Sequence, residues 1–187
     1  MEFYHVVTER PMRVGQHILF DEEYHSGVYF RVMEKKKLVD EIYRFPEKYA
    51  GEELKHHTKV ALRELALEEI RISEYSNYPS RMSSLYVSKT LEEAEKWFDF
   101  FEGLGRPTFQ IVKIRVNANV FEGNANRCFD GTVDKGKNLE LARAYWENDA
   151  KADEKHHPVV EVLVDGEIEV IDIIKLKLRT CKYIVVP

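Results

Sequence analysis

Two β-prone runs near the C-terminus, residues 159–164 and 167–173, limit the possible folds more than any other segment. They flank Asp165-Gly166, and a dipeptide of this kind readily adopts the positive φ angles of a two-residue hairpin turn. We therefore expect an antiparallel hairpin here, in which Glu161 lies opposite Val170. An antiparallel sheet is the first element of the fold that the sequence predicts.

The rest of the chain predicts short strands interspersed with helices. Gly15 marks a turn between the first two strands, and the Asn- and Gly-rich segment 117–136 is expected to be a long irregular connection, a kind that often carries function. The expected strands are 3–7, 16–20, 85–87, 109–116 and, at an edge, 183–186. The expected helices are 28–44, 52–75, 91–103 and 139–150.

The boundary between the strand 85–87 and the next helix has a specific sequence signal. Thr90 is followed three residues later by Glu93, which is the spacing of a capping box. The threonine hydroxyl can accept from the backbone amide of Glu93 while the glutamate side chain reaches back. The strand is thus expected to feed directly into the helix, and Gly103 is expected to supply a left-handed cap at the helix end.

This order of elements predicts an α+β fold with a mixed or antiparallel, half-open sheet, not a regular doubly wound one. The 187 residues are enough for one domain with a real core and too few for two ordinary domains with a linker. We therefore expect a single domain spanning residues 1–187. A hydrophobic share of 44% and an aromatic share of 12% are typical of a globular chain.

Charge and cysteine content exclude several classes of protein. The 28 basic and 33 acidic residues are interspersed and give a net charge of -5, which weighs against a protein that binds nucleic acid by neutralising many phosphates. Only Cys128 and Cys181 are present, so there is neither a disulfide framework nor a CxxC metal pair. The N-terminus lacks a basic start and an apolar signal core, and no apolar run approaches the ~20 residues of a membrane span. A cytoplasmic protein without a membrane segment is expected.

Glu161 is the first candidate for chemistry. It stands inside the apolar run 159–164, and a carboxylate buried in such a strand needs a partner or a function. Alternatively, Glu161 points to solvent from a half-exposed strand, since it shares a face with Leu163 and Asp165. The pairs His56-His57 and His156-His157 predict no metal site, because adjacent helical residues point about 100° apart and no third ligand is evident.

Three segments together carry a resemblance to a known fold. His5 lies in the middle of the first strand, the run Ser84-Leu85-Tyr86-Val87-Ser88 leads into a helix with an early Glu and Ala, and a late strand carries Glu161. In this order they resemble the ADP-ribosyltransferase-like fold and, more narrowly, an uncharacterised family of bacterial proteins related to it. The resemblance implies a split, mostly antiparallel sheet with flanking helices and NAD held in the cleft between its two halves.

The resemblance also implies roles for individual residues. His5 would bond the ribose hydroxyls next to nicotinamide, and Ser84, Tyr86 or Ser88 would lie beside the nicotinamide ring. Glu161 would be the catalytic acid, assisted by His5 and Tyr86. Arg81 and Arg127 would be the candidates for binding the NAD pyrophosphate, since a planar guanidinium suits paired phosphate oxygens, and the alternative for both is an ordinary surface role. Breaking the bond to nicotinamide builds positive charge on the ribose carbon, which a nearby carboxylate stabilises.

The sequence leaves three functions open. Val159 stands two positions before Glu161, where transferases that modify arginine carry a second acid, so arginine-directed transfer is not indicated. The first function is NAD-dependent ADP-ribosyl transfer to an acceptor, protein or nucleic acid, that the sequence does not identify. The second is a non-catalytic sensor of NAD or a related nucleotide on the same fold. The third is a protein-interaction module.

Overall fold

The computed structural model describes residues 1–20, 25–117, 119–148 and 159–176. Within them the chain divides into two compact units. Unit 1 combines the N-terminal 18 residues with 87–116 and the segment from 168, and unit 2 contains 19–86 and 117–167. Each unit has its own antiparallel sheet and its own buried apolar clusters. The single domain with one core that the sequence predicts stays a prediction.

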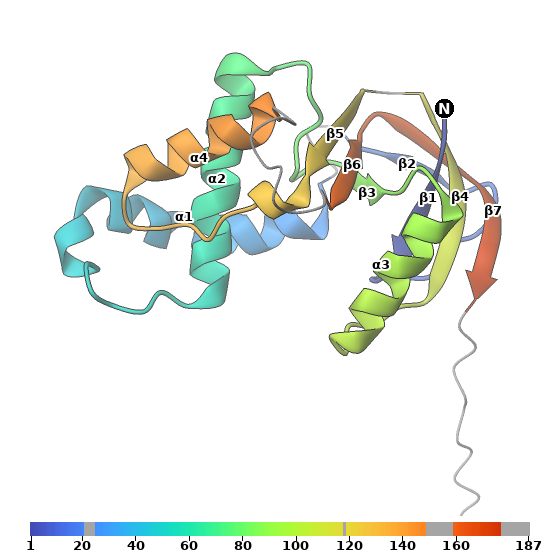
Figure 1. The fold of residues 1–187 in the computed structure, drawn as a ribbon, viewed down its shortest axis with the longest axis horizontal. Coiled ribbons are helices and arrows are strands. Elements are labelled where there is room, and N and C mark those ends of the chain that lie inside the picture. Colours follow the sequence, from blue (N-terminus) through green and yellow to red (C-terminus); the bar gives the residue numbers. More distant parts are fainter. Residues whose placement is uncertain (21–24, 118, 149–158, 177–187) are drawn as a thin grey trace, which may run out of the picture. The chain divides into compact units, whose positions relative to one another are not determined.

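Unit 1 is built on a four-stranded sheet with the order β1-β4-β7-β2 (Figure 1). Strands β1 and β4 are antiparallel, with Phe3 paired to Ile114 and Val6 to Ile111. The helix α3 packs against β1 through a cluster formed by Val6, Ala94, Phe98 and Ile111. The elements of this unit are β1 (Glu2–Val7), β2 (His17–Leu19), α3 (Leu91–Gly103), β4 (Gln110–Asn117) and β7 (Glu167–Leu176).

Helix α3 begins as the sequence predicts. The Thr90 hydroxyl accepts from the backbone amide of Glu93 at 3.2 Å, and the Glu93 carboxylate accepts from the backbone amide of Thr90 at 3.2 Å. The predicted left-handed cap is wrong, because Gly103 is the last helical residue and does not have a positive φ angle. The positive φ of 70° falls on Gly105, two residues later, where the chain has already left the helix.

Unit 2 combines a three-stranded sheet, with the order β3-β6-β5, and the α-helices α1, α2 and α4 (Figure 1). Helix α2 packs against both α1 and α4, and the contacts are made by two apolar clusters. The elements are α1 (Gly27–Arg44), η1 (Pro46–Lys48), α2 (His56–Glu74), β3 (Leu85–Val87), β5 (Val120–Asn124), η2 (Ala125–Arg127), α4 (Lys135–Glu147) and β6 (Val160–Val164).

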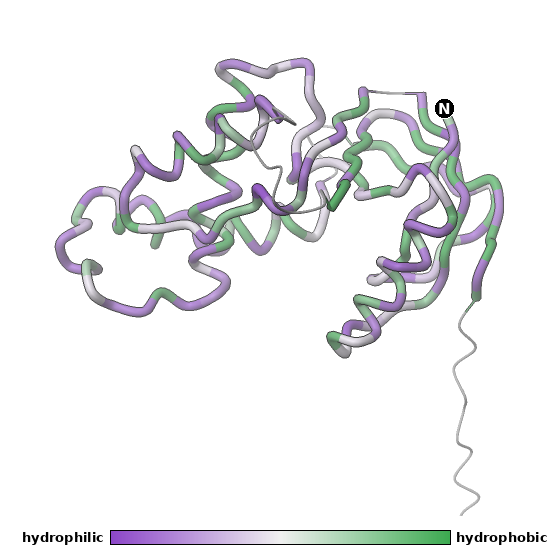
Figure 2. Tube along the Cα trace, viewed as in Figure 1, coloured by the Kyte–Doolittle hydropathy of each residue, from purple (hydrophilic) through white to green (hydrophobic). Residues whose placement is uncertain are grey.

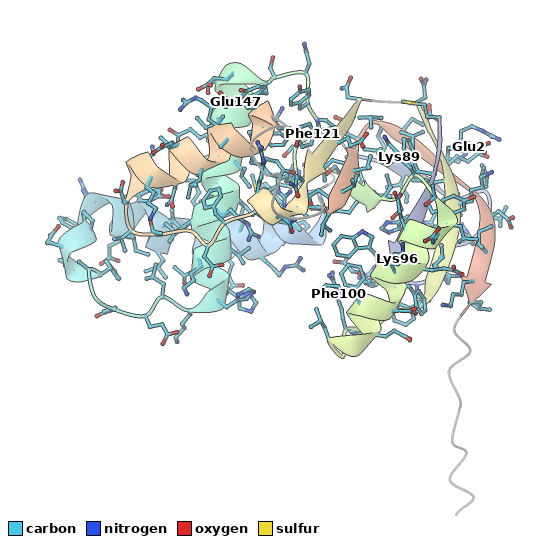
Figure 3. All side chains as sticks on the ribbon, viewed as in Figure 1. Glu2, Lys89, Lys96, Phe100, Phe121 and Glu147 are labelled. Atoms are coloured by element: carbon cyan, nitrogen blue, oxygen red, sulfur yellow. The ribbon has the colours of Figure 1, made fainter. Side chains whose placement is uncertain are left out.

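The apolar cluster beside the small sheet is rich in rings. Phe121 of β5 lies 5.5 Å from Tyr145 and 4.7 Å from Trp146, measured between ring centroids (Figure 3). The Trp146 indole donates to the backbone carbonyl of Leu67 at 2.8 Å, which joins α4 to α2. Strand β6 is almost wholly hydrophobic (Figure 2), and its only charged residue is Glu161.

The expected hairpin does not form. Strands occur at both predicted runs, but β6 belongs to the sheet of unit 2 and β7 to that of unit 1. Glu161 is therefore paired with Gly123 of β5 and not with Val170. The physical reason lies at the turn, where Asp165 bonds Asn119 ahead of β5: its amide donates to the Asn119 carbonyl at 3.4 Å, and its carboxylate accepts from the Asn119 amide at 3.1 Å.

Other predicted boundaries also need correction. The segment 117–136 is not wholly irregular, because it contains β5, which finds its partner β6 far along the chain. The helix expected at 52–75 begins at His56, and the one expected from 139 begins at Lys135, where the Asp134 side chain accepts from the Lys137 amide. The predicted strand 183–186 and the end of the predicted helix at Ala150 lie outside the described residues.

Candidate active site

Glu161 is buried on the small sheet of unit 2. Residues paired across antiparallel strands place their side chains on the same face, and the partner of Glu161 is Gly123. A β-carbon at position 123 would lie 2.6 Å from the Phe121 ring and 3.5 Å from the Tyr145 hydroxyl, so the close approach of these two groups depends on glycine. Glu161 is only 8% exposed, and the interpretation in which it points to bulk solvent is therefore wrong.

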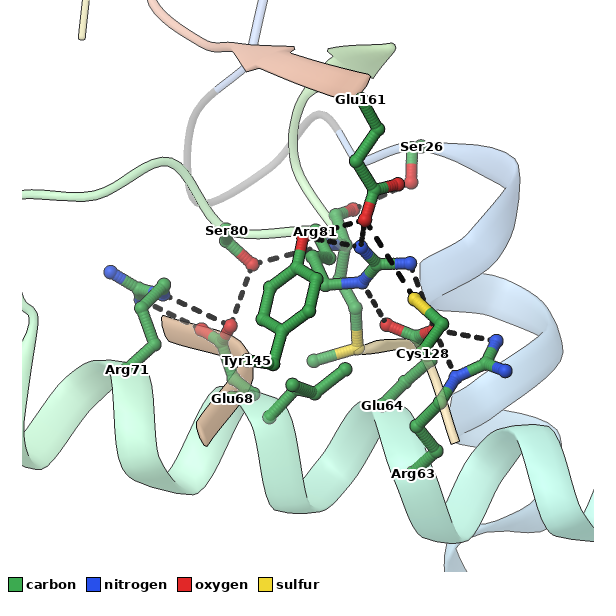
Figure 4. A network of polar contacts seen from close by, with 12 residues as sticks. Ser26, Arg63, Glu64, Glu68, Arg71, Ser80, Arg81, Cys128, Tyr145 and Glu161 are labelled. Carbon is green, nitrogen blue, oxygen red and sulfur yellow. Dashed lines mark hydrogen bonds and ion pairs between the residues drawn. The ribbon is translucent and has the colours of Figure 1, made fainter. Parts of the chain in front are cut away.

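The contacts that described residues make with the Glu161 carboxylate all go to one of its two oxygens. Oε1 accepts from Arg81 Nη1 at 2.8 Å, from the Tyr145 hydroxyl at 2.8 Å and from the Cys128 thiol at 3.7 Å (Figure 4). Within the described part of the chain, no donor contacts Oε2. The side chain is thus fixed through one oxygen.

Arg81 is the centre of this network. Its Nε donates to Glu64 Oε2 at 2.9 Å and its Nη2 to Glu64 Oε1 at 3.4 Å, while Nη1 donates both to Glu161 and to the Tyr145 hydroxyl. Every nitrogen of the guanidinium therefore donates to an acceptor of the protein itself. A phosphate group would have to displace one of these contacts, and binding of the NAD pyrophosphate by Arg81 stays a prediction.

The charges of the network balance one another. Burial acts to raise the pKa of Glu64, but the guanidinium groups of Arg81 and Arg63 outweigh it and hold this pKa below its ordinary value. Burial acts to lower the pKa of Arg81, but Glu64, Tyr86 and Glu161 outweigh it and raise that pKa well above its ordinary value. The buried ion pair between Arg81 and Glu64 therefore remains charged at neutral pH.

One face of α2 positions the segment that carries Arg81. Residues three or four apart on a helix lie on the same face, and Glu64, Glu68 and Arg71 follow this spacing. The Glu68 carboxylate accepts from the Ser80 hydroxyl at 2.8 Å (Figure 4), and Arg71 Nη1 donates to the Tyr78 carbonyl at 3.1 Å. These bonds hold residues 78–81 along the helix, which fixes the place where the Arg81 side chain begins.

Tyr86 and Ser84 lie on or next to β3, the neighbour of β6 in the sheet. The guanidinium carbon of Arg81 is 5.4 Å from the centroid of the Tyr86 ring and 5.0 Å from that of Tyr145. Burial raises the pKa of Tyr86, so its phenol keeps its proton. Ser84 is 2% exposed, and its hydroxyl has no hydrogen-bond partner among the described residues.

His5 and Ser88 belong to unit 1, whereas the other predicted site residues belong to unit 2. His5 lies on β1, where its Cα is paired with Val112. Ser88 is 5% exposed, and its backbone exchanges hydrogen bonds of 2.8 and 2.9 Å with Tyr4. The structure thus gathers Arg81, Tyr86 and Glu161 in one unit. The roles that the resemblance gives to these three, and to His5, Ser84 and Ser88, stay predictions.

Sequence reasoning missed two members of the network, Glu64 and Tyr145. Glu64 is 2% exposed and lies three residues after Ala61 and three before Leu67, within the apolar face of α2. A carboxylate at that position was a usable signal, because buried charges are nearly always paired. Tyr145 offers no such signal, since an aromatic residue on a buried helix face is an ordinary core residue.

Cys128 is not expected to act as a nucleophile at neutral pH. Burial raises the pKa of its thiol to about 11, and the nearby Glu161 carboxylate acts in the same direction. In a Cys181→Ser variant, we expect the rate of alkylation by iodoacetamide to rise with pH up to about 11, because only the thiolate reacts. The same variant unfolded in urea should show the ordinary thiol midpoint near pH ~8.5. A folded-state midpoint at or below the unfolded one would contradict this assignment.

The fold and the site define an α+β protein with two antiparallel sheets, in which an arginine and a tyrosine anchor a buried carboxylate on the smaller sheet. A family model described as a protein of unknown function, DUF2441, matches residues 3–176, and the chain belongs to this family. No curated protein matches the sequence. In the ranges that the structure describes, none of the helices has the length and apolar character needed to cross a membrane.

Proposed function

We propose that this protein binds NAD as a substrate and transfers its ADP-ribose group, with Glu161 as the catalytic acid of the resembled fold. The observation that carries the proposal is the one-sided anchoring of the Glu161 carboxylate. If Glu161 served only to neutralise the charge of Arg81, both of its oxygens could be hydrogen bonded, as both oxygens of Glu64 are. Oε2 of Glu161 has no such partner in the described residues, and this leaves it available to a substrate.

The chemistry of the proposed reaction suits such a group. The bond between the ribose carbon and the nicotinamide nitrogen breaks, and its electron pair leaves with nicotinamide, which becomes neutral. The positive charge moves to the ribose, where a fixed carboxylate oxygen stabilises it more strongly than in the ground state. The acceptor then forms its bond to the ribose carbon and loses a proton.

The neighbours of Glu161 have supporting roles in this proposal. Arg81 and Tyr145 hold Oε1, so that the carboxylate is already oriented and does not have to move during the reaction. The ring of Tyr86 offers a flat surface for nicotinamide, and its neutral phenol adds no charge of its own. Ser84 brings a buried hydroxyl that has no partner in the described residues and that a ligand can use. His5 would bond the ribose hydroxyls, as the resemblance implies.

Release of nicotinamide from NAD tests the proposal. The Glu161→Gln variant keeps the shape of the side chain and an oxygen for Arg81 and Tyr145, but it removes the negative charge. We expect nicotinamide release, and labelling of proteins in a lysate by radioactive NAD, to fall about 100- to 1000-fold, as when one stabilising group is removed from a transition state. Calorimetry with NAD should show that the variant still binds.

The matched control is Glu122→Gln, which removes an exposed carboxylate from the neighbouring strand β5. This variant should retain the wild-type rate. Binding of NAD without turnover by the wild type would favour a sensor, and absence of binding would favour an interaction module. Either result, or equal rates for wild type and Glu161→Gln, rejects the transferase proposal.

A further inference from the structure

Unit 2 contains a second candidate site, separate from the Glu161 carboxylate. It is a cavity of about 380 Å³, within the size range of small-molecule sites. It is lined by Phe20, by residues at and just before the start of α1, by the C-terminal half of α2, by residues of the segment 76–83, and by Asn119 and Asp165, all of which belong to unit 2. Glu161 and Arg81 are not among the lining residues.

Aromatic rings form one wall of this cavity. The rings of His25 and Tyr29 are stacked, with centroids 3.7 Å apart and planes inclined by 23°. His25 Nδ1 is hydrogen bonded to the Ser83 hydroxyl at 3.0 Å, and Ser26 donates to the Met82 carbonyl through both its amide and its hydroxyl. The wall is thus held in place before any ligand arrives, which favours binding of a planar ring.

The cavity is lined by several hydroxyl groups and by three charged side chains. Two carboxylates line it, those of Glu68 and Asp165, together with one guanidinium, that of Arg71. Arg71 directs Nε and Nη2 at Glu68 and directs Nη1 at the carbonyls of Ser76 and Tyr78. The guanidinium is therefore committed to the protein, whereas Asp165 has one oxygen that no described residue contacts.

We propose that this cavity binds a nucleoside, that is, a planar ring joined to a group with several hydroxyl donors and no phosphate. The stacked pair of His25 and Tyr29 suits the ring, and the carboxylate of Asp165 suits a hydroxyl or amino donor. A phosphate is disfavoured because it would face the Asp165 carboxylate, whereas the Arg71 guanidinium already bonds Glu68 and two backbone carbonyls. The proposal does not depend on the transferase activity, since NAD carries the phosphates that this cavity rejects.

Calorimetry with the four ribonucleosides and their monophosphates tests this site in the full-length protein. At least one nucleoside should bind with a Kd below about 1 mM, and its monophosphate should bind about tenfold more weakly. Tyr29→Leu should weaken nucleoside binding at least tenfold, about the effect of losing one stacked base. Ser83→Ala, which removes one hydroxyl and little volume, should weaken it severalfold even if Tyr29→Leu fails to fold. His56→Ala, at the start of α2 and outside the cavity, should bind as the wild type does.

The variant Asp165→Asn tests the role of charge. Asparagine keeps the oxygen that accepts from the Asn119 amide, so the local structure is preserved while the charge is removed. The difference in affinity between nucleoside and monophosphate should shrink. Failure of all four nucleosides to bind, equal binding of the monophosphate by the wild type, or an unchanged ratio in Asp165→Asn would each overturn the proposal. None of these results depends on whether NAD is cleaved.

Discussion

Replacement of Arg81 by methionine is expected to lower the free energy of unfolding by about 3–5 kcal/mol, the usual effect of removing one partner from a buried ion pair. The side chain of Arg81 is 6% exposed and is paired with Glu64 and Glu161. Without it, Glu64 keeps the contact with Arg63, but Glu161 keeps only the neutral donors Tyr145 and Cys128. A buried carboxylate without a cation is the most unfavourable outcome of this change.

Urea unfolding followed by the fluorescence of Trp146 measures this effect in unit 2. A Trp97→Phe background removes the other tryptophan, which lies in unit 1. The control is Arg143→Met, which removes an arginine paired with Glu74 at 2.6 and 2.8 Å but 42% exposed, and it should cost no more than about 1 kcal/mol.

A second substitution separates lost charge from lost packing. In the double variant Arg81→Met/Glu161→Gln the unpaired carboxylate is gone, so more than half of the lost free energy should return. The single variant should also be less destabilised at pH 5 than at pH 8. An unpaired buried carboxyl has a raised pKa in the folded state, so its contribution worsens as the pH rises. A pH-independent loss that the double variant does not recover would show that packing alone is responsible.

Local signals in the sequence predicted most of the elements and failed on their pairing. Thr90 and Glu93 make the predicted capping box, and α1 and β1 lie within one residue of the expected ranges. The pairing of β6 failed because the Asp165-Gly166 signal describes a turn and not the strands that meet beside it. Which strand pairs with β6 depends on Asn119 and on Gly123, more than 35 residues away in the chain.

The sequence predicted the acid of the candidate site, Glu161, but not the residues that hold its carboxylate in place. Glu161 interrupts an apolar strand, and a buried carboxylate of that kind is visible in the sequence. Its partners Arg81 and Tyr145 come from a loop and from α4, and Glu64 of α2 in turn pairs with Arg81. Helical periodicity can show that Glu64 faces the core, but it cannot show which residue lies opposite. The path of the segment 78–81 along α2 decides that, and no single-sequence pattern encodes it.

Replacement of Gly131 by alanine is expected to cost about 3 kcal/mol, the upper part of the range for an overpacked core. A β-carbon there would lie 2.5 Å from the Leu62 β-carbon, 2.5 Å from the Lys59 carbonyl oxygen and 2.8 Å from the Arg63 amide nitrogen. Two of these atoms belong to the backbone of α2 and cannot turn aside. The Gly131 amide also donates to the Lys59 carbonyl at 3.2 Å, so the close approach is itself a bonding contact.

The same urea experiment measures this loss, and Gly136→Ala is the matched control. Gly136 lies in the first turn of α4, where an added β-carbon would be 3.4 Å from an Asp134 carboxylate oxygen. Alanine is there expected to be neutral or to stabilise the protein by up to about 1 kcal/mol, because it favours the helix. If Gly131→Ala proves as harmless as Gly136→Ala, the backbone at Gly131 does not pack closely against α2. The turn of α2 that carries Arg63 and Glu64 would then not be held in place by this contact.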